Sequence, residues 1–291
     1  QQYYSNLNKY DTDKWIFYSN QSNLSVSDYT YFGCAKDTTN NENCTETRSV
    51  NTIITTPIIV YPINNTPIID STPTLIWNNS LGGGTTKTYQ LILDNDSTFS
   101  SPNVNVTINE TTESTNYTLT TDLTVDKTYY WEVQAYDTKA YSNWSIAQFD
   151  LLSSVAVSLP RTSVDFGNMT AGEQKNTTQA GLAPLVISND GNIPINISVN
   201  ATALFTSTNP DLPGLYQFNI TMNETNAYNS ILFSTWMDLN STEMPAIDSL
   251  KQENTTNTAN RANMDIKIKI PSDQGGGNRS SLIYIKAVSS G

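Results

Sequence analysis

The sequence contains no histidine, only two cysteines and few charged residues. Without histidine the chain cannot build a Ser-His-Asp or Cys-His catalytic arrangement, an imidazole metal site or an imidazole switch near neutral pH. Charged residues make up 14% of the chain and the formal net charge is -12. An acidic chain is repelled by phosphate backbones, so nucleic acid is not an expected partner.

Long hydrophobic runs are also missing. No apolar stretch approaches the roughly 18 residues that a membrane-spanning helix needs, so we expect no membrane span in this chain. The first residues, Gln1 to Tyr4, are neither basic nor followed by an apolar stretch, as a signal peptide would be. We therefore expect either a mature form from which any signal peptide has been removed or a piece of a longer protein.

Small polar residues are what the chain has in excess, with 35 Asn, 40 Thr and 30 Ser among 291 residues. The sequence contains 19 Asn-X-Ser/Thr sequons, whereas chance placement would give about 8. They begin at Asn20, Asn23, Asn43, Asn64, Asn78, Asn95, Asn105, Asn109, Asn116, Asn143, Asn168, Asn176, Asn196, Asn200, Asn219, Asn223, Asn240, Asn254 and Asn278. We expect covalent N-glycans at these positions. The alternative is a coincidence of strand threonines with turn asparagines.

Several sequons fall on one phase of an alternating apolar and polar pattern, which is typical of half-buried β-strands. Three stretches show it, 193–200, 103–109 and 218–223. Their apolar sets are Ile193, Ile195, Ile197 and Val199; Val104, Val106 and Ile108; and Phe218, Ile220 and Met222. The sequon asparagines occupy the other phase, so we expect them on the solvent side of each strand.

Residues 56–152 show the clearest domain pattern. Leu123 lies six residues before Tyr129, and apolar residues follow at alternate positions from Trp131 onward. This resembles the fibronectin type III pattern, and the resemblance implies a β-sandwich with a tyrosine corner formed by Leu123 and Tyr129. Trp77, on an earlier strand, is expected in the same core with Leu123, Tyr129 and Trp131. The resemblance says little about function, because such sandwiches serve as spacers and as binding modules.

Residues 1–55 partly repeat that pattern at an offset of 100, with Tyr31 at the place of Trp131. We expect a partial immunoglobulin-like β unit with a hairpin joined by a disulfide between Cys34 and Cys44. Such a bridge would contribute on the order of 2 to 3 kcal/mol and would fit an exported protein. Two unpaired buried cysteines are the alternative. The unit is too short for a complete sandwich, so something must cover its strand edges. The candidates are an upstream segment absent from this chain, the neighbouring domain, or a strand donated by another copy.

Residues 153–291 are expected to form a third β-sandwich. Its Leu-x-Ile-x-Asn-x-Gly segment, 185–191, resembles sandwich domains of bacterial and archaeal surface proteins, including filament-forming ones. The Asp190-Gly191 pair predicts a hairpin between the flanking strands. A short helix is expected within 231–250. The predicted fold class is therefore all-β, with tandem immunoglobulin-like or fibronectin type III-like sandwiches.

Carboxylates are the acid-base groups that remain, and most aspartates lie in turn sequences. Asp94 and Asp96 could hold a structural Ca²⁺ through their oxygens, although the spacing is not that of an EF-hand. Turn formation explains them without a metal and is the preferred interpretation, because Asp bonds its own backbone in turns. We expect no catalytic residue, no metal site and no cofactor beyond the glycans.

These features predict a non-enzymatic structural glycoprotein of a cell surface, archaeal in type, that assembles with copies of itself into an extracellular filament or surface layer (S-layer). Other surface glycoproteins or glycans are further expected partners. Two alternatives remain. One is an adhesin or receptor ectodomain that binds carbohydrate or protein, and the other is a set of accessory modules of a carbohydrate-active enzyme.

Overall fold

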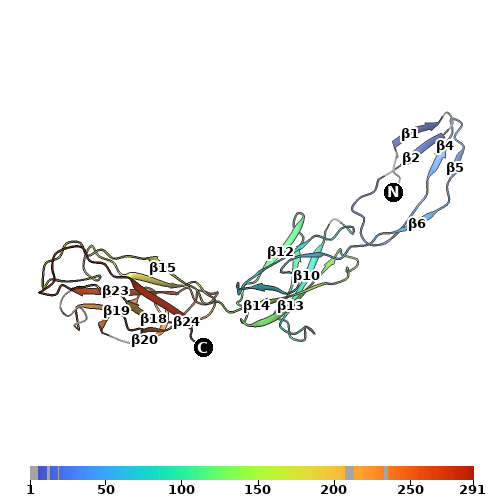
Figure 1. Ribbon diagram of the computed structural model, residues 1–291. Helices are drawn as coiled ribbons and strands as arrows, with labels where there is room; N and C mark the ends of the chain where they lie inside the picture. The colour runs from blue at the N-terminus through green and yellow to red at the C-terminus, as the bar shows by residue number, and fades with distance from the viewer. Residues whose placement is uncertain (1–5, 12–13, 19, 85, 207–212, 233–234) are drawn as a thin grey trace. The chain divides into compact units, whose positions relative to one another are not determined.

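The computed structural model describes residues 6–11, 14–18, 20–84, 86–206, 213–232 and 235–291. Every regular element in these ranges is a β-strand, numbered β1 to β24, and many of them are labelled in Figure 1. Within the same ranges no helix is long and apolar enough to cross a bilayer. The chain divides into two compact units, one of Gln1–Pro67, Pro73–Leu119 and Lys127–Asp150 and the other of Ile68–Thr72, Thr120–Asp126 and Leu151–Gly291.

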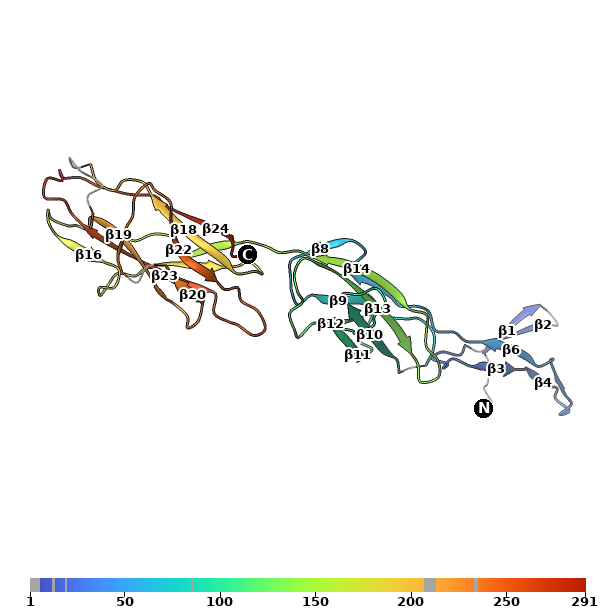
Figure 2. The same cartoon turned by 90° about the horizontal axis from the view of Figure 1, so that it is seen from below.

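The first unit contains a β-sandwich of two sheets, most of whose strands are labelled in Figure 2. The five-stranded sheet has the order β11 (Val104–Asn109), β10 (Thr88–Asp94), β13 (Lys127–Tyr136), β14 (Ser145–Leu151) and β8 (Thr66–Ile68). The three-stranded sheet has the order β12 (Ser114–Thr118), β9 (Thr74–Asn78) and β7 (Ile58–Tyr61).

Aromatic side chains from both sheets fill the core of this sandwich. Trp77 of β9 packs on Tyr89 of β10 with ring centroids 5.5 Å apart and on Trp131 of β13 at 6.4 Å. All three are fully buried. Tyr129 stacks on Phe149 at 5.7 Å, and both it and Leu123 are buried. Two face-to-face sheets joined by aromatic packing form the immunoglobulin-like or fibronectin type III-like sandwich expected from the sequence.

The N-terminal part of the same unit forms paired strands. Its pairs are β1 (Asn6–Asp11) with β2 (Lys14–Tyr18), β3 (Asp28–Tyr31) with β6 (Arg48–Asn51), and β4 (Cys34–Lys36) with β5 (Glu42–Cys44). Strands β3 to β6, whose side chains the structure describes, enclose no core. Nearly all side chains of β3 to β6 are exposed, and Tyr31 is 54% exposed where its counterpart Trp131 is fully buried. The repeat in the sequence therefore does not extend to burial. We call residues 20–55 the N-terminal arm.

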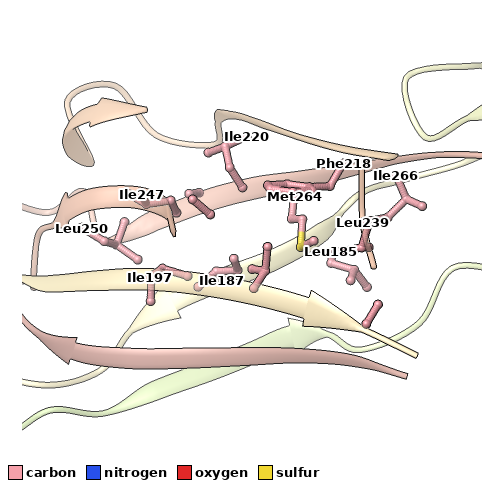
Figure 3. Close-up of a cluster of buried hydrophobic side chains, with 14 of the residues drawn as sticks. Leu185, Ile187, Ile197, Phe218, Ile220, Leu239, Ile247, Leu250, Met264 and Ile266 are labelled. Carbon is pink, nitrogen blue, oxygen red and sulfur yellow. The ribbon is translucent and has the colours of Figure 1, made fainter. Parts of the chain in front are cut away.

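The second unit holds another two-sheet sandwich. One sheet has the order β15 (Val157–Arg161), β17 (Leu185–Asn189), β23 (Arg261–Lys269), β19 (Tyr216–Met222) and β21 (Met237–Asp238), with β16 (Gln174–Asn176) also paired to β23. The other has the order β20 (Tyr228–Ile231), β22 (Met244–Leu250), β18 (Ile195–Ala201) and β24 (Ile283–Ser289). Figure 3 shows the aliphatic core between them, in which Ile197 and Met264 belong to opposite sheets.

Alternation along β18 is as the sequence predicts, since its residues are alternately buried and half-buried from Ile195 to Ala201. The hairpin predicted at Asp190-Gly191 is wrong, because β17 and β18 belong to different sheets. The chain crosses from one sheet to the other there. Pro194 immediately precedes β18, and Gly191 lies so close to the Ser154 carbonyl that a Cβ would sit 2.2 Å from its oxygen.

The short helix predicted within 231–250 is also wrong, because 244–250 forms β22. Ser249 has a left-handed φ of 56° and the register of β22 against β18 shifts between Ile247 and Leu250. This bulge places the apolar residues at intervals of one and three, which imitates helical spacing. The prediction for Met222 is also wrong: its side chain was expected in the core, but it is 54% exposed at the end of β19.

Candidate functional site

The sequon asparagines are distributed over both units, and none of the 19 is buried. Thirteen are exposed and six are half-buried. Among the exposed ones, Asn105 and Asn109 project from β11 and Asn116 from β12. A glycan is a bulky hydrated group that must reach solvent, so this placement is compatible with modification at most of the sites.

Two asparagines are buried, and neither lies in a sequon. Asn189 donates from Nδ2 to the carbonyls of Ile193 and Leu250, both at 2.9 Å. Asn260 donates from Nδ2 to the Asn189 carbonyl at 3.1 Å. These bonds close the loops at one end of the second sandwich and satisfy polar groups that water cannot reach. The two described asparagines that are buried are therefore structural residues outside sequons, whereas every sequon asparagine is exposed or half-buried.

Most half-buried sequon asparagines accept a hydrogen bond through the side-chain oxygen. Asn196 accepts from the Ser249 backbone N–H at 3.0 Å, and Asn240 accepts from that of Thr242 at 2.8 Å. A glycan replaces one hydrogen of Nδ2 and keeps the carbonyl oxygen. These local hydrogen bonds are therefore compatible with an attached sugar.

Asn219 is the exception among the sequon asparagines. Its Oδ1 is buried and has no hydrogen-bond partner in the described part of the chain. It pairs across the sheet with Asp265, which is buried and accepts hydrogen bonds from Thr177 and Thr221, each at 2.7 Å. Two residues beyond Asp265 on β23, the Lys267 Nζ lies 4.7 Å from the ring centroid of Trp236. This part of the outer sheet face is partly covered by other side chains. The alternating pattern therefore predicted the correct face for Asn219, but its side chain is half-buried instead of fully exposed to solvent.

The edges of the first sandwich all carry a feature that opposes pairing with another strand. Pro57 and Pro62 flank β7, and Pro67 lies within β8. The other two edges, β11 and β12, carry sequon asparagines. Proline removes a backbone donor, and a glycan would obstruct an approaching chain.

The second sandwich has three short or interrupted edges and one regular edge. Pro160 interrupts β15, β21 has two residues, and β20 has four. The fourth edge, β24, has seven residues, contains neither proline nor sequon, and pairs with β18 through an unbroken register. Proline and sequon positions could have been marked on predicted strands from sequence, but edge strands cannot be identified without the sheet order.

The two cysteines are bonded to each other, and Cys34 and Cys44 face one another across β4 and β5. Among the described residues, these two and Glu42 form the one group of three potential metal ligands. A disulfide leaves no thiolate, so this group does not offer a metal site. At the hairpin tip, hydrogen bonds from Asn41 and Thr39 lower the pKa of Asp37 to about 2.

The aspartates considered for Ca²⁺ are engaged in turns. Asp94 accepts the backbone N–H groups of Asp96 at 3.3 Å and Ser101 at 3.2 Å. Asp96 accepts from Thr98 and Ser100, and the backbone hydrogen bond from Thr98 is the largest cause of its lowered pKa. The arrangement is an Asx turn, in which the carboxylates are already satisfied by the protein.

Asp137 is a structurally important residue that the sequence did not indicate. It is 1% exposed, and its carboxylate accepts four backbone N–H groups. The donors are Val26 at 2.7 Å, Gly84 at 3.2 Å, and Lys139 and Ala140 at 3.1 Å each. Burial raises the pKa of Asp137, but these hydrogen bonds outweigh it and hold the pKa below its ordinary value. The residue thus joins the N-terminal arm to the β13 end of the sandwich.

No protein-family profile matches the sequence, and a search of curated proteins also finds no match. Among solved structures, the chain is similar to the crystal structure of the FN1–FN3 domains of chicken CNTN1, with 10% identity and a TM-score of 0.27. The similarity covers 85% of this chain and 74% of that one. A likeness of this size carries no argument about function; the fold assignment rests on the sheets and cores described above.

Proposed function

We propose that this protein is a non-enzymatic structural glycoprotein of a cell surface, archaeal in type, whose copies assemble into an extracellular filament or surface layer. The β-sandwich fold fits extracellular structural and binding modules in general. The more specific role rests on the chain's surface chemistry. Its acceptor side chains cover both sandwiches, and its proline-bearing and sequon-bearing edges would restrict pairing to chosen places.

The division of the asparagines is the observation that carries the proposal. All 19 sequon asparagines lie outside the cores, whereas Asn189 and Asn260, which the second core requires, lie outside sequons. The two groups are separated as glycan attachment requires, because a sugar on a buried asparagine prevents folding. The excess of 19 sequons over the roughly 8 expected by chance points in the same direction.

Glycopeptide mass spectrometry of the protein purified from its natural source tests the glycan component. We expect sugars at many exposed sequons and the lowest occupancy at Asn219, which is half-buried and has a buried Oδ1. Thr107→Ala provides a matched control, since it removes the Asn105 sequon while keeping the asparagine. An unmodified chain would contradict the proposal, and so would modification at Asn219 equal to that at Asn105.

Negative-stain electron microscopy of the same material tests the assembly component. Regular filaments or a lattice are expected. Dispersed single molecules at all concentrations would instead favour the second candidate, an adhesin or receptor ectodomain.

One observation favours that second candidate. Tyr136 and Tyr141 stack with centroids 4.5 Å apart at the end of β13, and Tyr141 is exposed. Exposed aromatic rings of this kind bind sugars or protein partners. Screening the chain against a glycan array, with Tyr141→Ala as the comparison, distinguishes this function: loss of a specific signal on substitution would support it.

A further inference from the structure

The β24 strand offers one side of its backbone for pairing. In Figure 1 it lies beside β18, and β18 is its one partner among the described strands. Immediately before β24, the Leu282 carbonyl accepts from the Thr202 N–H, and immediately after it the Ser290 N–H donates to the Pro194 carbonyl. The backbone groups of these two even-numbered residues therefore point toward β18.

In an antiparallel strand, the backbone N–H and C=O groups of successive residues point alternately to one neighbouring strand and to the other. The backbone groups of the odd-numbered residues of β24 therefore point away from β18. These residues are Ile283, Ile285, Ala287 and Ser289. Their N–H and C=O groups form a regular row along the open edge, the arrangement to which another extended strand can add by main-chain hydrogen bonds. No bulge interrupts the row, because the register from Ile283 to Ser289 is continuous.

The outward side chains of this edge are apolar for an exposed strand. Leu282 is 65% exposed, Tyr284 52% and Val288 47%. Lys286 is the one charged residue of β24. Its Nζ lies 3.0 Å from Oε1 of Glu243, which immediately precedes β22. A long, regular, apolar edge is the kind that natural proteins normally block, and each other edge of the two described sandwiches carries a proline or a sequon or is short. Its retention here suggests use.

The edge is self-complementary about Ile285. If two copies pair antiparallel with Ile285 opposite itself, Leu282 faces Val288 and Tyr284 faces Lys286 on the outer side. On the inner side Ile283 faces Ala287. Every odd residue then meets an odd residue, so the open hydrogen-bonding groups of the two copies match. A register one rung further along would place Lys286 against Lys286, a like-charge pair that destabilises a sheet.

We propose that β24 is a homotypic assembly edge, which pairs antiparallel with β24 of a second copy across a two-fold axis at Ile285. The inference rests on the proposed function as a self-assembling surface protein and specifies one of its contacts. A two-fold contact closes on itself and yields dimers. Growth of a filament or layer therefore uses this contact together with a second one elsewhere on the chain.

Cysteine cross-linking of the full, glycosylated chain tests the pairing and its register. In the proposed ladder Leu282 and Val288 of opposite copies form a non-hydrogen-bonded pair with Cα atoms about 4.5 Å apart, within reach of a disulfide. Within one copy they are six residues apart along one extended strand, about 20 Å, so they cannot bond to each other.

Leu282→Cys/Val288→Cys is expected to give covalent dimers under mild oxidation, seen on a non-reducing gel and by light scattering. The single variants Leu282→Cys and Val288→Cys are the matched controls and should remain uncross-linked. A double variant that stays monomeric would overturn the pairing. Equal cross-linking of the single variants would overturn the register and the specificity.

Ala287→Pro supplies an independent test. Its N–H faces the open edge, so proline removes a donor to the second copy without removing a bond to β18, and an edge strand tolerates it. Two bonds are lost in a two-fold dimer, and we expect dimerisation to weaken about 10- to 100-fold. Ala287→Ser, which keeps the donor, should dimerise normally. An unchanged dimer affinity for a folded Ala287→Pro would count against the proposal.

The two proposals fail in different ways. Filaments or lattices in native material without cross-linked β24 dimers would contradict the β24 contact and would still support the proposed function. Cross-linked dimers in a protein that carries no glycans and never forms larger assemblies would leave the edge standing and remove the function.

Discussion

At the scale of single residues, Asp137 has the most concentrated set of interactions in the first unit. Its carboxylate accepts four backbone N–H groups, including that of Val26 in the N-terminal arm. Removing an acceptor leaves its donors buried and unsatisfied, which costs more than the hydrogen bonds themselves contribute. The arm has few apolar contacts of its own, so this carboxylate matters more to it than a single turn residue normally would.

Asp137→Ala is expected to lower the free energy of unfolding of the first unit by about 2 to 4 kcal/mol. It should also reduce hydrogen-exchange protection of the Val26 and Gly84 amides. Asp137→Asn keeps one side-chain oxygen as acceptor and should lose less. Chemical denaturation with hydrogen-exchange mass spectrometry measures both effects. Full protection of Val26 in Asp137→Ala would show that the arm is held by something else.

The same residue gives the arm a defined response to acid. Its folded pKa is lower than the ordinary value of 3.8, so on acidification the unfolded chain takes up the proton first. The stabilisation is therefore complete above about pH 5 and declines as the pH falls through 3.8 and below.

At the scale of elements, the bulge in β22 shows how a single backbone angle shapes a strand. Ser249 adopts a left-handed φ of 56°, and its N–H donates to the Asn196 side chain. A β-branched side chain in this conformation costs about 1 to 2 kcal/mol. Glycine has no such cost.

Ser249→Val should accordingly lower the free energy of unfolding of the second unit by about 1 to 2 kcal/mol, whereas Ser249→Gly should leave it close to that of the natural chain. Urea denaturation followed by intrinsic fluorescence compares the pair. Equal stabilities of the two variants would mean that the bulge does not impose this backbone conformation.

Strand identity and face were predictable from the sequence where the pattern was local. The alternation of Ile195, Ile197 and Val199 and the aromatic series around Trp131 each depend on residues within one strand. The Asp190-Gly191 crossing was not predictable in this way, because the same turn residues serve a hairpin and a passage between sheets. The covered face around Asn219 depends on Trp236 and Thr177, which are distant in sequence, and so does the identity of β24 as an edge.

At the scale of the whole molecule, stability is distributed unequally along the chain. The sandwiches each bury a continuous apolar core, while the described part of the arm buries few side chains. The disulfide between Cys34 and Cys44 lies within the arm and closes a loop of about ten residues, worth roughly 2 to 3 kcal/mol to that hairpin.

Replacing both cysteines by serine is therefore expected to increase hydrogen exchange within 34–44 and to leave the melting of the two sandwiches unchanged. Calorimetry together with hydrogen exchange tests this on the full chain. Serine keeps the size and removes the bond, and chemical reduction of the natural chain gives an independent comparison. A lowered melting temperature of either sandwich would show that the arm contributes to its core.

The separation of Asn189 and Asn260 from the sequons has a consequence for the order of glycosylation and folding, if the chain is glycosylated as proposed. An enzyme that modifies a chain before it folds meets only the three-residue signal, since no surface yet exists to distinguish inside from outside. For a chain glycosylated as proposed here, the two asparagines that later close the second core carry no such signal. Sugar attachment can then precede folding without a chaperone having to protect these positions.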